Sequence, residues 1–197
     1  MINFRTDLAL ERNEVYKEKN KLNEIDGVSV NNETINEVEI SRIKILNEEG
    51  EKILQKPAGT YITLDVKKLK LADEERLSKI AETVADELRK IVGEHVNETE
   101  DILVVGLGNL YVTPDALGPK VVPEIEVTRH ILEYMPSIMP EDTRPVSAIS
   151  PGVLGVTGIE TMEILKGVVQ NVKPKLLIVI DALATRRIRI RTRIRTR

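Results

Sequence analysis

The stretch ILVVGLGN at residues 102–109 decides the fold class of this chain. Its first half, Ile102 to Val105, is an unbroken apolar run of strand length, which is typical of a strand buried on both faces of a parallel sheet. A glycine-rich loop, Gly106 to Asn109, follows directly. Glycine lets the backbone turn sharply and brings N–H groups close to a ligand. We therefore expect an α/β fold with this loop at the carboxyl end of a strand.

Further along the chain, Val146–Ile149 is predicted to form a strand, and Leu176–Ile180 repeats the buried-strand pattern. Residues 121–134 and 158–172 carry apolar positions at helical spacing and are predicted to form helices. Strands that alternate with helices favour a largely parallel, doubly wound sheet.

The first part of the chain has a different pattern. Residues 28–66 alternate between apolar and polar positions, which predicts an additional N-terminal β-hairpin region. The alternation slips at Ser41–Arg42, where we expect a β-bulge. A turn signal at residues 47–50 precedes a return strand predicted to begin at Ile53.

Two helices are expected beside these strands. Residues 7–24 form a weakly periodic polar segment, and residues 73–92 have a clear apolar stripe at helical spacing. Asp73 is the predicted N-cap of the second helix, and Gly93 is predicted to end it.

Composition restricts the chemistry of the chain. Its 197 residues include no cysteine, which removes disulfides, thiolate metal sites and cysteine nucleophiles and fits a reducing compartment. The opening residues, MINFRTDLALERNE, lack the apolar segment of a secretory signal. No apolar run approaches the ~20 residues of a membrane span, so no membrane partner is expected.

Charge is distributed unevenly along the chain. Residues 186–197 read RRIRIRTRIRTR and contain seven arginines and no acid. The rest keeps 22 of the 29 basic residues against 32 acidic residues, a net charge of −10. Such an acidic body argues against nucleic acid as a general partner, although the arginine-rich run alone has the charge to bind phosphate.

Two aspartates follow predicted strands. Asp115 lies in the proline- and glycine-restricted loop TPDALGP, residues 113–119, and Asp181 directly follows the strand at 176–180. Ligands of open α/β sheets bind at the carboxyl ends of strands. Two carboxyls at one cleft can share a proton, so that one activates a water and the other protonates a leaving group. A surface turn for Asp115 and an N-cap for Asp181 are the plain structural alternatives, and the sequence leaves them open.

Other chemistries have weaker support. A dinucleotide loop needs a third glycine where Tyr111 stands, and the lysine of a phosphate-binding loop is absent. Neither a Gly-x-Ser-x-Gly elbow nor a His-Glu-x-x-His motif occurs, and we expect no metal and no cofactor. The glycine-rich segment at residues 151–158 is either part of a cleft or a plain connector.

Taken together, several segments resemble the germination protease family, and they occur in the family's order over residues 5–184. The segments are RTDLA at 5–9, VVGLGN at 104–109, VTPDALGP at 112–119, VTRH at 127–130, PGVLGVTGIET at 151–161 and IDALA at 180–184. Each is weak alone, whereas their joint order is specific.

The resemblance implies an endopeptidase of the forespore and spore core, hence cytoplasmic, that is made as a self-processing zymogen. It implies that the substrates are small acid-soluble spore proteins, degraded during germination, and that the protein is a homotetramer. It also implies an aspartic-type mechanism with two essential aspartates, which fall on Asp115 and Asp181.

The expected domain organisation follows from the same resemblance. Residues 1–7 would be a propeptide, cleaved between Asp7 and Leu8, and residues 8–184 the peptidase domain. The residues expected to bind substrate or line the cleft are Gly106, Gly108, Asn109, Gly155 and Gly158.

The chain departs from the family pattern after Ala184. The pattern continues beyond this residue, so we expect the peptidase domain to be C-terminally incomplete, and residues 185–197 resemble a low-complexity tail. Two other functions therefore stay open. One is a non-hydrolytic α/β module that binds a metal or a small molecule at the loop 106–109, and the other is an inactive truncated fragment.

Overall fold

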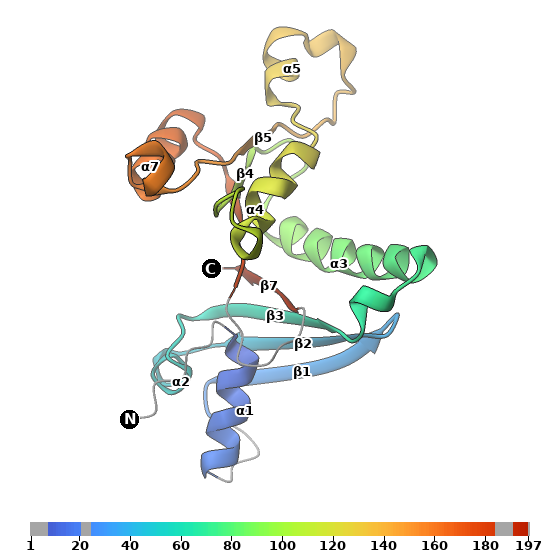
Figure 1. Cartoon of the computed structure of the whole chain (residues 1–197), viewed down its shortest axis with the longest axis vertical. Coiled ribbons are helices and arrows are strands. Elements are labelled where there is room, and N and C mark those ends of the chain that lie inside the picture. Colours follow the sequence, from blue (N-terminus) through green and yellow to red (C-terminus); the bar gives the residue numbers. More distant parts are fainter. Residues whose placement is uncertain (1–7, 21–24, 184–190, 197) are drawn as a thin grey trace. The chain divides into compact units, whose positions relative to one another are not determined.

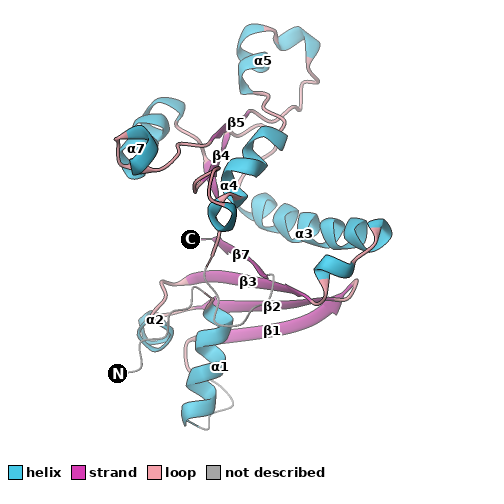
Figure 2. Ribbon diagram, viewed as in Figure 1, coloured by secondary structure: helices cyan, strands magenta, loops and turns pink. Residues whose placement is uncertain are grey.

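The computed structural model describes residues 8–20, 25–183 and 191–196, which divide into two compact units (Figures 1 and 2). One unit is built from the described residues up to Ile91 together with 191–196, and the other from Val92 to Leu183. The elements of the first are α1 (Ala9–Asn20), β1 (Val28–Ile35), β2 (Val38–Ile45), α2 (Glu48–Leu54), β3 (Gly59–Val66), α3 (Glu74–His95, which runs into the second unit) and β7 (Arg191–Thr196). Those of the second are β4 (Ile102–Gly106), α4 (Leu117–Val121), α5 (Arg129–Tyr134), β5 (Val146–Ile149), α6 (Leu154–Thr157), α7 (Thr161–Val172) and β6 (Leu176–Ile180).

The first unit is built on an antiparallel sheet with strand order β1–β2–β3–β7. Asn36 and Glu37, at the tip of the β1–β2 hairpin, have φ values of 49° and 62°, as a two-residue type I′ turn requires. The predicted β-hairpin region is confirmed. The bulge predicted at Ser41–Arg42 is wrong, because every residue of β2 is paired with both neighbouring strands.

The slip in alternation arises because β2 is buried on both faces. Val38 and Ile40 share a core cluster with residues of α3, whereas Ile43 and Ile45 share another with residues of α1 and α2. Figure 1 shows α3 on one side of this sheet and α1 on the other. Successive strand residues point to opposite faces, so a change of buried face shifts the apolar parity without an inserted residue.

A short helix, α2, replaces the return strand that was predicted to begin at Ile53. The side chain of Asn47 accepts a hydrogen bond from the N–H of Gly50 at 2.9 Å, which caps the first turn. Leu54, at the end of α2, is buried in the core beside α1. The polar turn signal therefore marks a helix start, and the strand begins later, at Gly59.

An ion pair fastens α3 to the sheet. Glu87 of α3 is buried, and Arg42 of β2 approaches it with Nε 2.9 Å from Oε2 and Nη2 2.7 Å from Oε1. Lys90 also contacts Oε1, at 2.8 Å. Hydrogen bonding to the Arg42 guanidinium holds the pKa of Glu87 below its ordinary value and raises that of Arg42. Such two-pronged contacts compensate the burial of the carboxylate.

The arginine-rich run contributes the fourth strand of this sheet. Residues 191–196 form β7, antiparallel to β3, with Arg191 opposite Asp65 and Thr196 opposite Thr60. The sequence suggested low complexity here, but arginine alternating with threonine or isoleucine also has the period of two that a strand requires.

The second unit contains a three-stranded parallel sheet in the order β5–β4–β6, which confirms the predicted α/β core. The central strand β4 is wholly buried. Leu165 of α7 lies in the cluster on one face, and Val96 lies with Ile102 and Val104 in the cluster on the other. No helix in the described part of the chain is long and apolar enough to cross a membrane.

The helix predicted over residues 121–134 is wrong as one element. The chain forms α4, a 3-10 turn at Val122–Glu124 that contains Pro123, and then α5. Between them Thr128 is bound to β5, because its N–H donates to Val146 O at 3.0 Å and its Oγ1 accepts the Val146 N–H at 2.9 Å. These bonds to a strand interrupt the helical run.

Two other predicted helices are confirmed with shifted ends. The helix predicted at residues 73–92 continues to His95, and Gly93 lies inside it. Asp73 caps this helix as expected, since its Oδ1 accepts the N–H of Arg76 at 2.9 Å. The helix predicted from residue 158 begins at Thr161, as α7.

Candidate active site

The loop after β4 is held by contacts of its own backbone. The N–H of Leu107 donates to Ile180 O at 2.8 Å, which ties the loop to the end of β6. Gly108 has φ +121°, a conformation that L side chains rarely adopt. A Cβ on Gly108 would lie 2.0 Å from the backbone oxygen of Asp115. Glycine is therefore required where this loop passes Asp115.

Asp115 turns its side chain back to the same loop. It ends a 3-10 turn, Thr113–Asp115, and is half-buried. Its Oδ2 accepts the N–H of Asn109 at 2.9 Å. Within the described residues no hydrogen bond reaches the other oxygen, Oδ1. One oxygen is thus anchored to the loop, and the other accepts no hydrogen bond from the described residues.

Gly118 determines how closely the Asp115 segment approaches the sheet. A Cβ on Gly118 would lie 2.3 Å from Leu107 O and 2.5 Å from Ile180 O, and a Cβ on Gly106 would lie 2.2 Å from Gly118 O. Backbone atoms cannot rotate out of the way as a side chain can. This role of Gly118 was not predicted, although a glycine between Leu117 and Pro119 in the loop that carries Asp115 is a signal for a close approach.

Asp181 directly follows β6 and is exposed. Its Oδ1 accepts the N–H of Ala182 at 2.8 Å. Because Gly106 and Ile180 are register partners in parallel strands, the Asp115 loop and Asp181 leave adjacent strands at the same edge of the sheet. No hydrogen bond joins the two carboxyls in the part of the chain that the structure describes.

The loop after β5 leaves from the same edge. Gly155, in α6, and Gly158, directly after it, are both exposed. A Cβ on either would meet nothing within 4 Å, and Gly158 ends α6 with φ +70°. Close packing therefore does not explain these two glycines, in contrast to Gly106 and Gly118.

Only one side of the predicted processing site lies within the described residues. Asp7 lies outside them. Leu8 directly precedes α1 in the first unit, and only 1% of its surface is exposed. Its backbone oxygen accepts the N–H of Arg12 at 3.3 Å. The predicted cleavage point thus adjoins a buried side chain.

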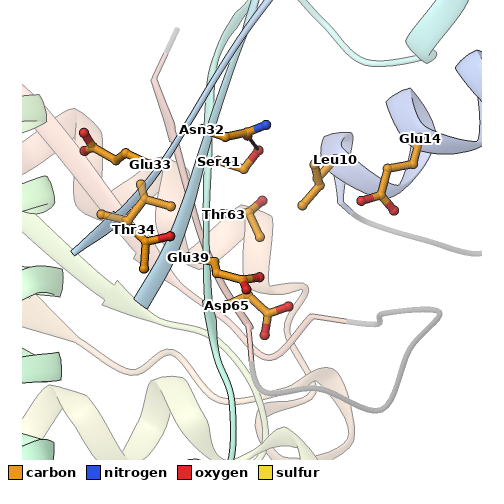
Figure 3. Close-up of a pocket in the computed structure, with 10 residues that line it drawn as sticks. Leu10, Glu14, Asn32, Glu33, Thr34, Glu39, Ser41, Thr63 and Asp65 are labelled. Carbon is orange, nitrogen blue, oxygen red and sulfur yellow. Dashed lines mark hydrogen bonds between the residues drawn. The ribbon is translucent and has the colours of Figure 1, made fainter. Parts of the chain in front are cut away.

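A pocket of about 430 Å³ opens in the first unit (Figure 3). It is lined by residues of β1, β2, β3 and α1, including the carboxylates of Glu14, Glu39 and Asp65. It contains neither candidate aspartate. Among the described residues, no three His, Asp or Glu side chains are grouped so as to hold a metal ion.

The second unit is therefore an α/β protein with a candidate acid–base site, in which adjacent parallel strands each end near one aspartate. A family model described as "Germination protease" matches residues 5–196. This match covers nearly the whole chain, including the arginine-rich run. The chain belongs to the germination protease family.

Individual relatives agree with this assignment. The chain is 48% identical over 188 residues to the germination protease of Clostridium acetobutylicum, which covers 95% of this chain and 57% of that protein. It is 52% identical over 191 residues to the germination protease of Caldanaerobacter subterraneus subsp. tengcongensis, a match that covers 95% of this chain and 56% of that protein. It is 44% identical over 189 residues to the germination protease of Priestia megaterium, a match that covers 93% of this chain and 51% of that protein. The chain spans about half the length of the curated relatives it matches.

Proposed function

We propose that this chain carries the catalytic aspartates of an endopeptidase that initiates degradation of small acid-soluble spore proteins during germination. The observation that carries the proposal is that Asp115, bound to the loop after β4, and Asp181, directly after β6, follow adjacent parallel strands in a chain of the germination protease family. Carboxyl ends of strands are where α/β sheets bind ligands.

The proposed reaction is hydrolysis of a peptide bond by two carboxyls. One carboxylate removes a proton from water while the water oxygen attacks the scissile carbonyl carbon. The other carboxyl, protonated at the outset, gives its proton to the amide nitrogen as the C–N bond breaks. The products are a carboxylic acid and an amine, so atoms and protons balance without a cofactor.

The surrounding glycine-rich loops suit an extended peptide. We assign cleft lining to Gly106, Gly108 and Asn109 on the loop after β4, and to Gly155 and Gly158 after β5. Backbone without large side chains allows close approach of a substrate chain.

The biological setting is part of the same proposal. We propose a zymogen whose residues 1–7 are removed by cleavage between Asp7 and Leu8, and a homotetramer that acts in the cytoplasm of the spore. The small acid-soluble spore proteins are the partners, as substrates.

The test is incubation of the chain, from which residues 1–7 have been removed, with a purified small acid-soluble spore protein, with fragments identified by mass spectrometry. We expect cleavage at defined bonds, reduced about 10²–10⁴-fold in Asp115→Asn, the usual contribution of a general acid or base. Asp142→Asn, which changes an exposed aspartate of the same unit, is the matched control and should cleave normally. Undiminished cleavage by Asp115→Asn, or none by residues 8–197 without a substitution, would contradict the proposal.

A further inference from the structure

We propose that Asn109 is a positioning residue for Asp115. Its backbone N–H orients the carboxylate, and its side chain holds that N–H in place. The consequence for catalysis rests on the proposed function, whereas the positioning itself is a claim about geometry and can be tested without any activity.

The N–H of Asn109 contacts Asp115 at two points. It lies 2.9 Å from the side-chain oxygen Oδ2 and 3.1 Å from the backbone oxygen of the same residue. A donor shared in this way fixes the side chain of Asp115 relative to its own backbone. The direction of the free oxygen, Oδ1, is then set by the position of one N–H group.

Hydrogen bonds close a ring around this N–H. Asn109 donates to Asp115, the N–H of Asp115 donates to Val112 O at 2.8 Å, and the N–H of Val112 donates to Asn109 O at 3.1 Å. A displacement of any of the three residues would therefore move the Asp115 carboxylate.

The side chain of Asn109 stabilises the ring. Its Oδ1 accepts the N–H of Tyr111 at 3.0 Å, the local bond that makes asparagine a turn residue. Gly108 contributes by the absence of a side chain, since a Cβ there would also lie 3.2 Å from Asp115 Oδ1. Alanine at position 109 would keep the N–H but lose the bond that holds the turn.

This assignment differs measurably from substrate binding by Asn109. A residue that acts through Asp115 affects the chemical step, so its loss lowers kcat and leaves KM unchanged. Loss of a residue that only binds substrate raises KM and leaves kcat unchanged. The N–H itself has a spectroscopic signature that needs no substrate.

The first experiment uses amide NMR spectra of the ¹⁵N-labelled full chain. In Asp115→Ala we expect the Asn109 amide proton to move to higher field, because it loses its side-chain acceptor at 2.9 Å. Asn171→Ala, in α7, is the control, because the Asn171 side chain bonds only to Gly167 O among the bonds described, and it should leave the Asn109 signal in place. An unmoved Asn109 signal in Asp115→Ala overturns the proposal, whether or not the chain cleaves protein.

The second experiment measures cleavage kinetics. We expect Asn109→Ala to lower kcat by about 10–100-fold at unchanged KM, as small misplacements of reacting groups do. Asn109→Ser, whose hydroxyl makes the same turn bond more weakly, should recover part of the loss. A raised KM at unchanged kcat overturns the proposal. Absence of cleavage by the unaltered chain contradicts the proposed function alone, and the amide shift then decides the positioning.

Discussion

Two strands of this chain, β3 of the antiparallel sheet and β6 at the side of the parallel sheet, differ in how completely they are buried. In β3 of the antiparallel sheet every residue from Tyr61 to Val66 is buried. In β6 of the parallel sheet none is, and Leu177 and Val179 are 43% and 47% exposed. The candidate aspartates nevertheless lie at the edge of the parallel sheet.

This difference suggests that substitutions in the two sheets affect different properties, namely the free energy of unfolding and the rate of the proposed reaction. The antiparallel sheet has helices on both faces and a buried ion pair, so changes there should act on the free energy of unfolding. The end of the parallel sheet is built from loops whose backbone contacts place two carboxyls, so changes there should act on the reaction. Functional residues commonly lie on loops positioned by a rigid scaffold.

The largest effect on stability is expected from Arg42→Ala, in the antiparallel sheet. Removing one partner of a buried ion pair typically costs about 3–5 kcal/mol, because the other charge stays buried, and the remaining contact of Glu87 with Lys90 places the expected loss at the lower end of this range. Arg89→Ala on α3 is the matched control, since the Arg89–Asp86 pair is exposed, and such pairs contribute below about 1 kcal/mol. Urea unfolding measures both. Equal effects of the two substitutions would show that the Arg42–Glu87 contact does not stabilise the sheet.

A pair of leucine substitutions compares the two sheets directly. Leu64→Ala removes a side chain that is 1% exposed, and we expect a loss of about 2–5 kcal/mol from the cavity and the lost burial. Leu177→Ala in β6 removes one that is 43% exposed and should cost about 1 kcal/mol or less. Thermal unfolding of both variants checks this ranking, and a larger loss in Leu177→Ala would reverse the comparison.

The smallest effect is a dependence of stability on acid. The pKa of Glu87 is lowered in the folded chain, so its contribution is complete above the ordinary value of 4.5 and is lost as pH falls through the folded value. Arg42 has a raised pKa and stays charged throughout this window.

We expect Glu87→Gln to lose less stability between pH 5 and pH 3 than the unaltered chain, in urea unfolding at each pH. Glu82→Gln, at an exposed position of the same helix, is the control and should leave the acid dependence unchanged. Identical slopes for Glu87→Gln and the unaltered chain would contradict the ionic role of Glu87.

The parallel strands were predictable because β4 and β6 are short, continuous apolar runs and β5 is a short segment interrupted only by Ser147. The errors occurred where tertiary contacts override local pattern. Burial of β2 on both faces produced the apolar pattern that predicted a bulge. The helix cap at Asn47 has the residue pattern that predicted a turn. The bonds of Thr128 to β5 interrupt the segment that was predicted to be one helix. None of these contacts is local in the sequence except the cap, whose asparagine suits both a turn and a helix start.

The sequence predicted the sheet edge at which the candidate site lies, but not the hydrogen bonds and close backbone contacts within it. Parallel strands bring their carboxyl ends to one edge, which places the segments after β4 and β6 there. The Asn109 N–H bond to Asp115 and the close approach of Gly118 to Ile180 depend on backbone distances of a few ångströms. A residue pattern does not encode such distances, although the glycines indicate where close approaches are possible.

The most direct test of this account compares cleavage of a small acid-soluble spore protein by Asp115→Asn, Asp181→Asn and the double variant. Catalytic groups that act as a unit are not additive. The account predicts that each single variant loses nearly all cleavage and that the double variant loses no more than either. Losses that multiply in the double variant, or full activity in either single variant, would contradict a shared role of the two aspartates.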